Sequence, residues 1–325
     1  MKLAWYIGGL LGLALLIILV VRADFGAMVQ TLAVAGWAML WLVPYRTLYF
    51  LLYAIGWLNL LRPYDSKRRA GLGYLLWVTS VREAIDRLLP VASVGGGVAG
   101  VRLLRWRGLA VAPVGASVIV EILVTLIVLY VFTAVGLLLL IDINATDHEV
   151  RRLLLAFLCS LPVPAALALL LRYGSIFARL QKLLRPLVGG SATSEGAAAL
   201  DLEVRAILHR GWTLLGVGAM QLVAWMSGAF EVWFVLRLCG HPVGIGAALI
   251  MESMTQAMRH IAFVVPAGLG VQEAGLVLFG HLLGVSGELA LAVSMAKRVR
   301  EVLCGLPPLL SWQWFEGRRL LGATR

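Results

Sequence analysis

The chain has 325 residues, of which 61% are hydrophobic and only 14% are charged, and its mean hydropathy is +0.92. A soluble domain is about half apolar and a quarter charged, so this composition excludes a soluble core and predicts a single integral membrane domain over 1–325. The net charge of +11 does not indicate a nucleic-acid partner, because Lys and Arg lie mostly beside apolar runs, as the positive-inside rule predicts.

Six apolar segments are long enough to cross a bilayer, and each is expected to be a membrane-spanning helix. The first is longer than the apolar region of a usual signal peptide, so we expect it to be retained. The fold class is therefore an all-α polytopic membrane protein. The six segments cover about 3–21, 36–61, 113–141, 153–171, 212–238 and 288–312.

Two further apolar segments, 70–101 and 244–283, are interrupted by proline and glycine. Such residues free backbone groups that lipid cannot satisfy. Each segment is therefore expected to enter the membrane and return as a re-entrant helical hairpin. The expected helix-breaking residues are Pro90, Gly95 and Gly96 in the first segment and Pro266, Gly268 and Gly270 in the second.

The charges of the connecting loops indicate a topology. Basic groups lie on both sides of the first interrupted segment, at 62–69 and 102–107, and both are cytoplasmic if the segment is a hairpin. The acidic loop 142–149 is then external, although two arginines just after it oppose this assignment. The basic stretch 172–210 is cytoplasmic. This pattern predicts that the N-terminus and the C-terminus both face the cytoplasm, N-in and C-in.

The two hairpins would then open to opposite sides, which is the geometry of an inverted-topology repeat with halves of about 22–141 and 172–312. A charge stands seven residues before each proline, with opposite sign in the two halves: Glu83 in the first and Arg259 in the second. The linker 172–210 begins with an amphipathic pattern that fits an interfacial helix on an anionic leaflet. A short connector packed on the bundle fits this pattern equally well.

Several ionisable side chains lie within the apolar segments, where an unpaired charge costs about 2.5–3.5 kcal/mol on insertion scales. We expect a polar cavity where the hairpins meet, in which basic groups hold an anionic headgroup and acids pair with them or carry a proton. The alternative is pairing within one helix at i,i+4 spacing, as between Arg82 and Asp86 or Lys297 and Glu301. The candidate residues are Arg46, Arg82, Glu83, Asp86, Arg102, Glu121, Arg259, Glu273, Lys297, Arg298, Arg300 and Glu301.

Motifs for enzyme chemistry are weak. His148 lies between two acids in the loop 142–149, but no second histidine stands near it. Ser93 has no adjacent base, and the glycines at 95–97 are not followed by the Lys-Ser/Thr of a P-loop. We therefore expect no catalytic residue, no metal and no cofactor.

Four stretches, in this order along the chain, resemble the flippase-like membrane family typified by the transmembrane half of lysylphosphatidylglycerol synthase. More narrowly, they resemble its hopanoid-biosynthesis-associated branch. The resemblance covers nearly the whole chain. The stretches are VREAIDRLLPVASVGGGVAGVRLL (81–104), ASVIVEILVTLIV (116–128), VVPAGLGVQEAGLVLFG (264–280) and AKRVREVLCGLPPLLSWQWFEGRRLL (296–321).

The resemblance implies a lipid transporter or flippase-like protein of the bacterial inner membrane that is not an enzyme, with a hopanoid or a phospholipid as its partner. The alternative is a membrane scaffold that gathers enzymes of lipid or hopanoid biosynthesis. The family's soluble aminoacyl-transfer domain has no counterpart here, so lipid lysylation is not expected. Two positions depart from the family pattern, since an amide is expected near Asp86 and an acid near Gly97. The family motifs fall on Arg82, Glu83, Pro90, Gly95, Gly96 and Arg102, on Pro266, Gly268, Gly270 and Glu273, and on Lys297, Arg298, Arg300 and Glu301.

Overall fold

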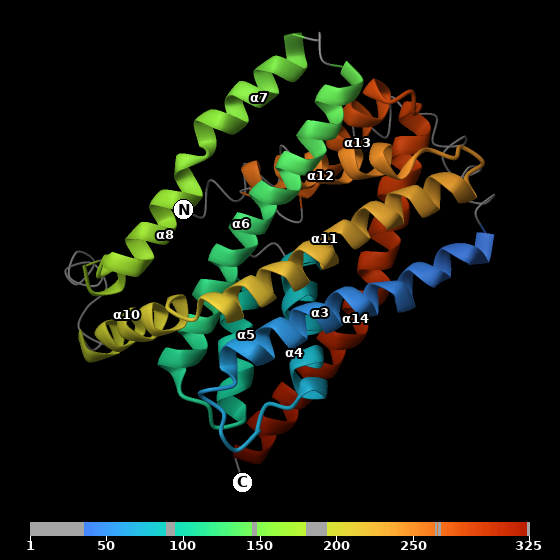
Figure 1. Ribbon diagram of the computed structural model, residues 1–325. Coiled ribbons are helices and arrows are strands. Elements are labelled where there is room, and N and C mark those ends of the chain that lie inside the picture. The colour runs from blue at the N-terminus through green and yellow to red at the C-terminus, as the bar shows by residue number, and fades with distance from the viewer. Residues whose placement is uncertain are drawn as a thin grey trace.

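The structure is a computed structural model that describes residues 36–88, 95–144, 148–179, 194–263, 265 and 268–323. Within these ranges the chain forms helices and no strand, which confirms the all-α fold class (Figure 1). Four of the described helical stretches are long and apolar enough to cross a membrane, and each coincides with an expected span. They are Gly36–Leu61, Val111–Ile143, Val150–Tyr173 and Gly211–Leu238. The expected first span, 3–21, lies outside the described residues.

The first half consists of a long helix, a helical hairpin and a second long helix. In the hairpin, the Tyr74 hydroxyl donates to the Leu103 carbonyl at 2.7 Å, and the Gly96 N–H donates to Asp86 Oδ1 at 2.9 Å. These two contacts run in opposite order along the chain, so the two helices are antiparallel. The elements are the 3-10 turn η1 (Gly36–Trp41), α3 (Leu42–Leu61), α4 (Leu72–Leu88), α5 (Gly95–Trp106) and α6 (Val111–Asn144).

The second half repeats this order of elements. In its hairpin, Arg259 Nη1 donates to Gln272 Oε1 at 2.5 Å, and a Cβ added to Gly275 would lie 3.0 Å from Thr255 Oγ1. The helices are therefore again antiparallel. In both hairpins the first helix has 17 residues and the second has 12. The elements are α11 (Gly211–Leu238), α12 (Ile245–Ile261), α13 (Val271–Leu282) and α14 (Gly287–Ala323).

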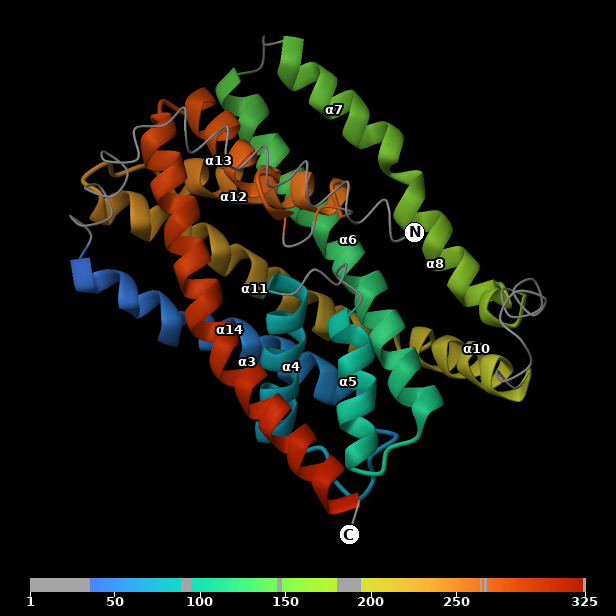
Figure 2. The same cartoon turned by 180° about the vertical axis from the view of Figure 1, so that it is seen from behind.

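The two halves cross each other in a reciprocal pattern. α3 packs against α11, α6 packs against the hairpin helix α12, and α14 packs against the hairpin helix α4. Figure 2 shows α14 running past α13 and then along α4, so that this single helix contacts both hairpins. The long helices that follow the hairpins, α6 and α14, thus each contact their own hairpin and that of the other half.

The expected span at 288–312 forms part of α14, which is not among the four helices of the described chain that are apolar enough to cross a membrane by composition. The helix has 37 residues and contains Pro307 and Pro308. Its polar side chains, including Lys297 and Arg300, are buried between helices instead of facing lipid. The segment is therefore helical throughout, but its charges are accommodated by protein contacts.

The segment between the halves consists of α7 (His148–Ser160), α8 (Pro162–Tyr173) and α10 (Ser194–Leu208). α10 packs against α6 and α8, whereas much of the amphipathic stretch that begins the linker lies outside the described residues. Just after α10, Arg210 donates to the carbonyls of Leu60 and Asn59 at 2.9 and 2.8 Å.

Tyr64, just after α3, lies against α10. Burial and a hydrogen bond with Glu203 of α10 raise the pKa of Tyr64 to about 12, so this phenol stays protonated.

The basic loops gather at one end of the molecule. Figure 1 shows the α3–α4 connection, the α5–α6 connection and the end of α14 together at this end, and the end of α6 that precedes α7 at the other. Here Arg107 stacks on Tyr74 at 4.3 Å, and Arg319 stacks on Trp106 at 4.3 Å from the ring centroid. Such aromatic and basic side chains are typical of a membrane–water interface.

Candidate functional site

A cavity of about 360 Å³ lies where the ends of the two hairpins meet. The end of α4 and the start of α5 form one side of it, and the end of α12 with the residues before α13 forms the opposite side. α3, α6 and α11 complete the wall. The charged residues of the lining are Arg46, Arg82, Glu83, Asp86, Arg87, Glu121, Glu252 and Arg259.

On the first-half side, the charges of the wall are paired across helices. Glu83 Oε1 accepts from Arg46 at 3.0 Å and from Arg87 at 3.1 Å. Arg82 Nη1 lies 2.8 Å from Glu121 Oε2, so α4 is joined to α6. A buried charge is stable only when paired in this way. The i,i+4 pair of Arg82 with Asp86 is not formed, because the guanidinium turns to α6.

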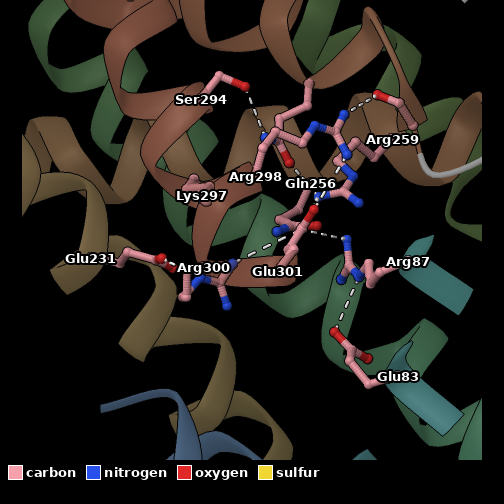
Figure 3. A network of polar contacts seen from close by, with 12 residues as sticks. Glu83, Arg87, Glu231, Gln256, Arg259, Ser294, Lys297, Arg298, Arg300 and Glu301 are labelled. Atoms are coloured by element: carbon pink, nitrogen blue, oxygen red, sulfur yellow. Dashed lines mark hydrogen bonds and ion pairs between the residues drawn. The ribbon is translucent and has the colours of Figure 1, made fainter. Parts of the chain in front are cut away.

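Glu301 is the centre of the network on α14 (Figure 3). Its Oε1 lies 3.8 Å from Arg87 and 3.8 Å from Arg259, and so links the first hairpin to the second. Its Oε2 accepts from Arg298 at 3.3 Å. Arg300 also approaches Oε1, at 3.9 Å. One carboxylate therefore faces four guanidinium groups that come from three helices.

A hydrogen-bonded chain holds the start of α13 against α14. Gln272 Nε2 donates to Ser294 Oγ at 2.9 Å, and Ser294 Oγ donates to Glu273 Oε1 at 2.8 Å. Arg298 Nε donates to the same carboxylate oxygen at 3.2 Å and Arg298 Nη2 to the Gly268 carbonyl at 3.2 Å. Gly268 precedes α13, and Gln272 and Glu273 are its second and third residues, so the polar chain joins the start of this helix to α14.

Two further buried ion pairs join α14 to the rest of the second half. Lys297 pairs with Glu252 of α12, and Arg300 Nε lies 2.6 Å from Glu231 Oε1 of α11. Lys297 and Glu252 are both at most 4% exposed at the side chain. The i,i+4 pair of Lys297 with Glu301 is not formed, because each side chain finds a partner on another helix.

The formal charges of the whole network balance. Seven basic residues face seven acidic ones, so a fully ionised cluster has no net charge. Such a balance keeps the cost of burying many charges low. The basic residues are Arg46, Arg82, Arg87, Arg259, Lys297, Arg298 and Arg300, and the acidic ones are Glu83, Asp86, Glu121, Glu231, Glu252, Glu273 and Glu301.

One ion pair occurs at corresponding places in the two halves, with the acidic and the basic residue exchanged. Glu121 and Lys297 are each the eleventh residue of the long helix that follows a hairpin. Glu121 pairs with Arg82 of its own hairpin, and Lys297 pairs with Glu252 of its own hairpin. At this position each half thus has a buried pair between the hairpin and the following helix, with the acid and the base exchanged.

An aromatic wall lies beside the charges. The Arg46 guanidinium stands over the Tyr49 ring at 3.6 Å, and Tyr49 stacks on Tyr53 at 4.7 Å between centroids. Trp225 Nε1 donates to the Tyr53 hydroxyl at 2.7 Å, and the Trp225 ring lies 5.2 Å from that of His260. These stacked rings fix the orientation of Arg46 at the cavity wall.

The cavity also has an apolar side. Ile122 of α6 and Phe263, just after α12, both line it, yet their side chains are 50% and 62% exposed. Leu126 and Val265 lie in the same part of the wall. In a membrane-spanning bundle, such exposed apolar side chains face lipid. The cavity therefore has an opening toward the side of the bundle, between α6 and the end of α12.

The structure brings together all the candidate residues except one. Arg102 lies at the basic end, where it pairs with Glu316 of α14, and its side chain is 58% exposed. Of the helix-breaking residues, Gly95 and Gly96 begin α5, and Gly268 and Gly270 have positive φ angles of 59° and 74° before α13. Pro90 and Pro266 lie outside the described residues.

Two central acids were missed from the sequence, Glu231 and Glu252. Both are isolated carboxylates within apolar segments, which is the same signal that pointed to Glu121. Gln256 and Gln272 were missed as well, since neutral amides carry no charge signal. Among the described residues, no His, Cys, Asp and Glu side chains are grouped so as to hold a metal ion.

Comparison with known proteins gave one finding. A family model described as the lysylphosphatidylglycerol synthase TM region matches residues 5–306. No curated protein and no solved structure matches the chain. The matched range includes both hairpins and every residue of the charged network.

Proposed function

From the premise that the chain belongs to the lysylphosphatidylglycerol synthase TM region family, we propose that it is a lipid transporter of the flippase-like kind. It acts in a bacterial inner membrane on a hopanoid or a phospholipid and is not an enzyme. The family membership supports a lipid-related membrane function. The more specific proposal, that the protein moves lipid across the membrane, is based on the cavity.

The observation that carries this proposal is the combination of a charged cavity with an apolar side opening. Arg46, Arg259 and Glu83 offer polar contacts to a headgroup inside the bundle. The exposed side chains of Ile122 and Phe263 at the opening leave room for acyl chains to stay in lipid. A water-soluble solute would need no apolar side opening, so the geometry favours a lipid over such a solute.

The proposal includes an inverted-topology repeat, with each hairpin re-entering the membrane from its own side. The equal helix lengths of the two hairpins support this arrangement, as does the reciprocal packing of α6 on α12 and α14 on α4. Neither hairpin contains a helix that qualifies as a spanning helix within the described chain. Broken helices that meet near the midplane would let one cavity face either leaflet.

The test measures leaflet exchange in vesicles that contain the purified protein and labelled lipids of several classes, including a hopanoid. We expect faster exchange of at least one class than in empty vesicles. Arg298→Ala or Glu273→Gln should slow that exchange about tenfold, which corresponds to the loss of about 1.4 kcal/mol of charged contacts. Arg102→Ala, outside the charged network, is the matched control and should retain the rate. Wild-type protein that moves no lipid class would refute the proposal.

A second candidate is a non-catalytic scaffold for lipid or hopanoid biosynthesis. The balanced pairing of the network favours it, because buried charges that only satisfy each other need no ligand. A scaffold should retain lipid-synthesis enzymes during purification and should tolerate exchange of the Glu252 and Lys297 charges. Comparing leaflet distributions of hopanoids and phospholipids between a deletion strain and its parent separates the two functions, since only loss of a transporter changes the distribution directly.

A further inference from the structure

Two charged groups of the cavity wall have weaker ion pairing than the others: Asp86 has none, and Arg259 has only a long contact to a shared carboxylate. Asp86 has no ion pair with any described residue, and its Oδ1 accepts only the Gly96 N–H. The nearest carboxylate oxygen to Arg259 is Glu301 Oε1 at 3.8 Å, which Arg87 and Arg300 also approach. Every other charged side chain of the lining has a direct ion-pair partner.

These two groups occupy corresponding places in the hairpins. Asp86 is the third residue from the end of α4 and contacts Gly96, the second residue of α5. Arg259 is the third residue from the end of α12 and contacts Gln272, the second residue of α13. One negative and one positive group therefore face the same cavity from the ends of the two hairpins.

The charge balance restricts the ligand. A cluster with no net charge best accepts a ligand with no net charge, because any excess charge would remain uncompensated in a site of low dielectric constant. A ligand without any charge would leave Asp86 without an ion-pair partner, and Arg259 with only the amide of Gln272 and the shared carboxylate of Glu301. The complementary ligand is therefore zwitterionic, with one anionic and one cationic group.

We infer that the cavity selects a zwitterionic phospholipid headgroup, in which Arg259 binds the phosphate and Asp86 binds the ammonium group. This inference rests on the proposed lipid transport and names its substrate class. A guanidinium is well suited to a phosphate, and a carboxylate accepts charge-assisted hydrogen bonds from a primary ammonium. The volume of about 360 Å³ lies within the usual range of small-molecule sites, and the opening at Ile122 and Phe263 leaves the acyl chains outside.

The test uses protein purified from mixed vesicles with equal amounts of phosphatidylethanolamine and phosphatidylglycerol, and native mass spectrometry of the retained lipid. Wild-type protein should retain phosphatidylethanolamine preferentially. Asp86→Asn keeps an oxygen for the Gly96 N–H but removes the charge, and should lower the ratio of retained phosphatidylethanolamine to phosphatidylglycerol about tenfold. Arg259→Gln should reduce retention of both lipids without lowering the ratio.

The lowered ratio in Asp86→Asn alone distinguishes the inference from simple misfolding, which would reduce both lipids together in both variants. Glu316→Gln at the basic end is the matched control and should leave the ratio unchanged. Equal retention of both lipids by wild type, or an unchanged ratio in Asp86→Asn, would overturn the inference. In the vesicle assay, exchange of phosphatidylglycerol as fast as phosphatidylethanolamine overturns the headgroup assignment alone, whereas no exchange of any lipid overturns the transport function.

Discussion

At the residue level, Glu301 contacts more basic side chains than a simple ion pair would. Four guanidinium groups approach the two carboxylate oxygens of Glu301, which is only 9% exposed. Two of the four, Arg87 and Arg259, come from different hairpins. The carboxylate therefore neutralises positive charge from both halves at once. The sequence predicts that Glu301 lies in the last helix, but only the fold shows which basic side chains it pairs with.

We expect Glu301→Gln to destabilise the protein by about 3–5 kcal/mol, because it leaves buried guanidinium groups without their shared counter-charge. Thermal unfolding of the purified protein in detergent measures the effect. Glu316→Gln removes the same charge from the exposed pair with Arg102 and should cost at most about 1 kcal/mol. Equal losses in the two variants would contradict the central place given to Glu301.

At the level of elements, the sequence predicts the spans and the hairpins better than it predicts the contacts. Long apolar runs determine helices, and Pro/Gly clusters mark breaks, so the boundaries follow from local chemistry. The ion pairs do not, because Arg82–Glu121 and Lys297–Glu252 join residues 39 and 45 positions apart. Helical spacing suggested Arg82–Asp86 and Lys297–Glu301 instead, and tertiary packing overrides both.

Gly96 is the residue on which closure of the first hairpin depends. A Cβ there would lie 2.5 Å from the Arg82 carbonyl oxygen and would also meet the Asp86 carboxylate. We expect Gly96→Ala to force the helices apart and to cost about 1–3 kcal/mol in thermal unfolding experiments. In Gly216→Ala of α11 the new methyl group meets nothing within 4 Å, and its better helix propensity should give up to about 1 kcal/mol of stabilisation. A neutral Gly96→Ala would show that α4 and α5 are not closely packed.

At the level of the whole molecule, a long helix of each half packs against the hairpin of the other half. α6 and α14 each pack on the hairpin of the other half, while the buried pairs of Glu121 and Lys297 stay within their own halves. Cohesion between halves therefore comes mainly from helix packing and from Glu301. The basic loops lie together at one end, so positive charge is distributed unevenly between the two ends of the molecule (Figure 1).

This uneven distribution of charge predicts the topology in the membrane. In a variant without Cys159, Cys239 and Cys304, we expect Asp142→Cys to react with a membrane-impermeant maleimide added to spheroplasts. Lys67→Cys and Arg318→Cys, at the basic end, should react only after the membrane is permeabilised. Labelling of all three positions from outside, or of the two basic positions alone, would contradict the N-in, C-in arrangement.

The paired prolines of α14 have a mechanical consequence. Pro307 and Pro308 lack an N–H, so the carbonyls of Leu303 and Cys304 have no donor four residues later in the helix. The part of α14 before them contacts Glu273 and Glu252, and the part after them lies near α4, where Trp77 donates to Ser311 at 2.8 Å. The helix can thus bend at Pro307 and Pro308 without breaking further backbone hydrogen bonds. Such a bend would change the angle between the part of α14 that binds the second hairpin and the part that lies along α4, with the Arg87–Glu301 contact close to the bend.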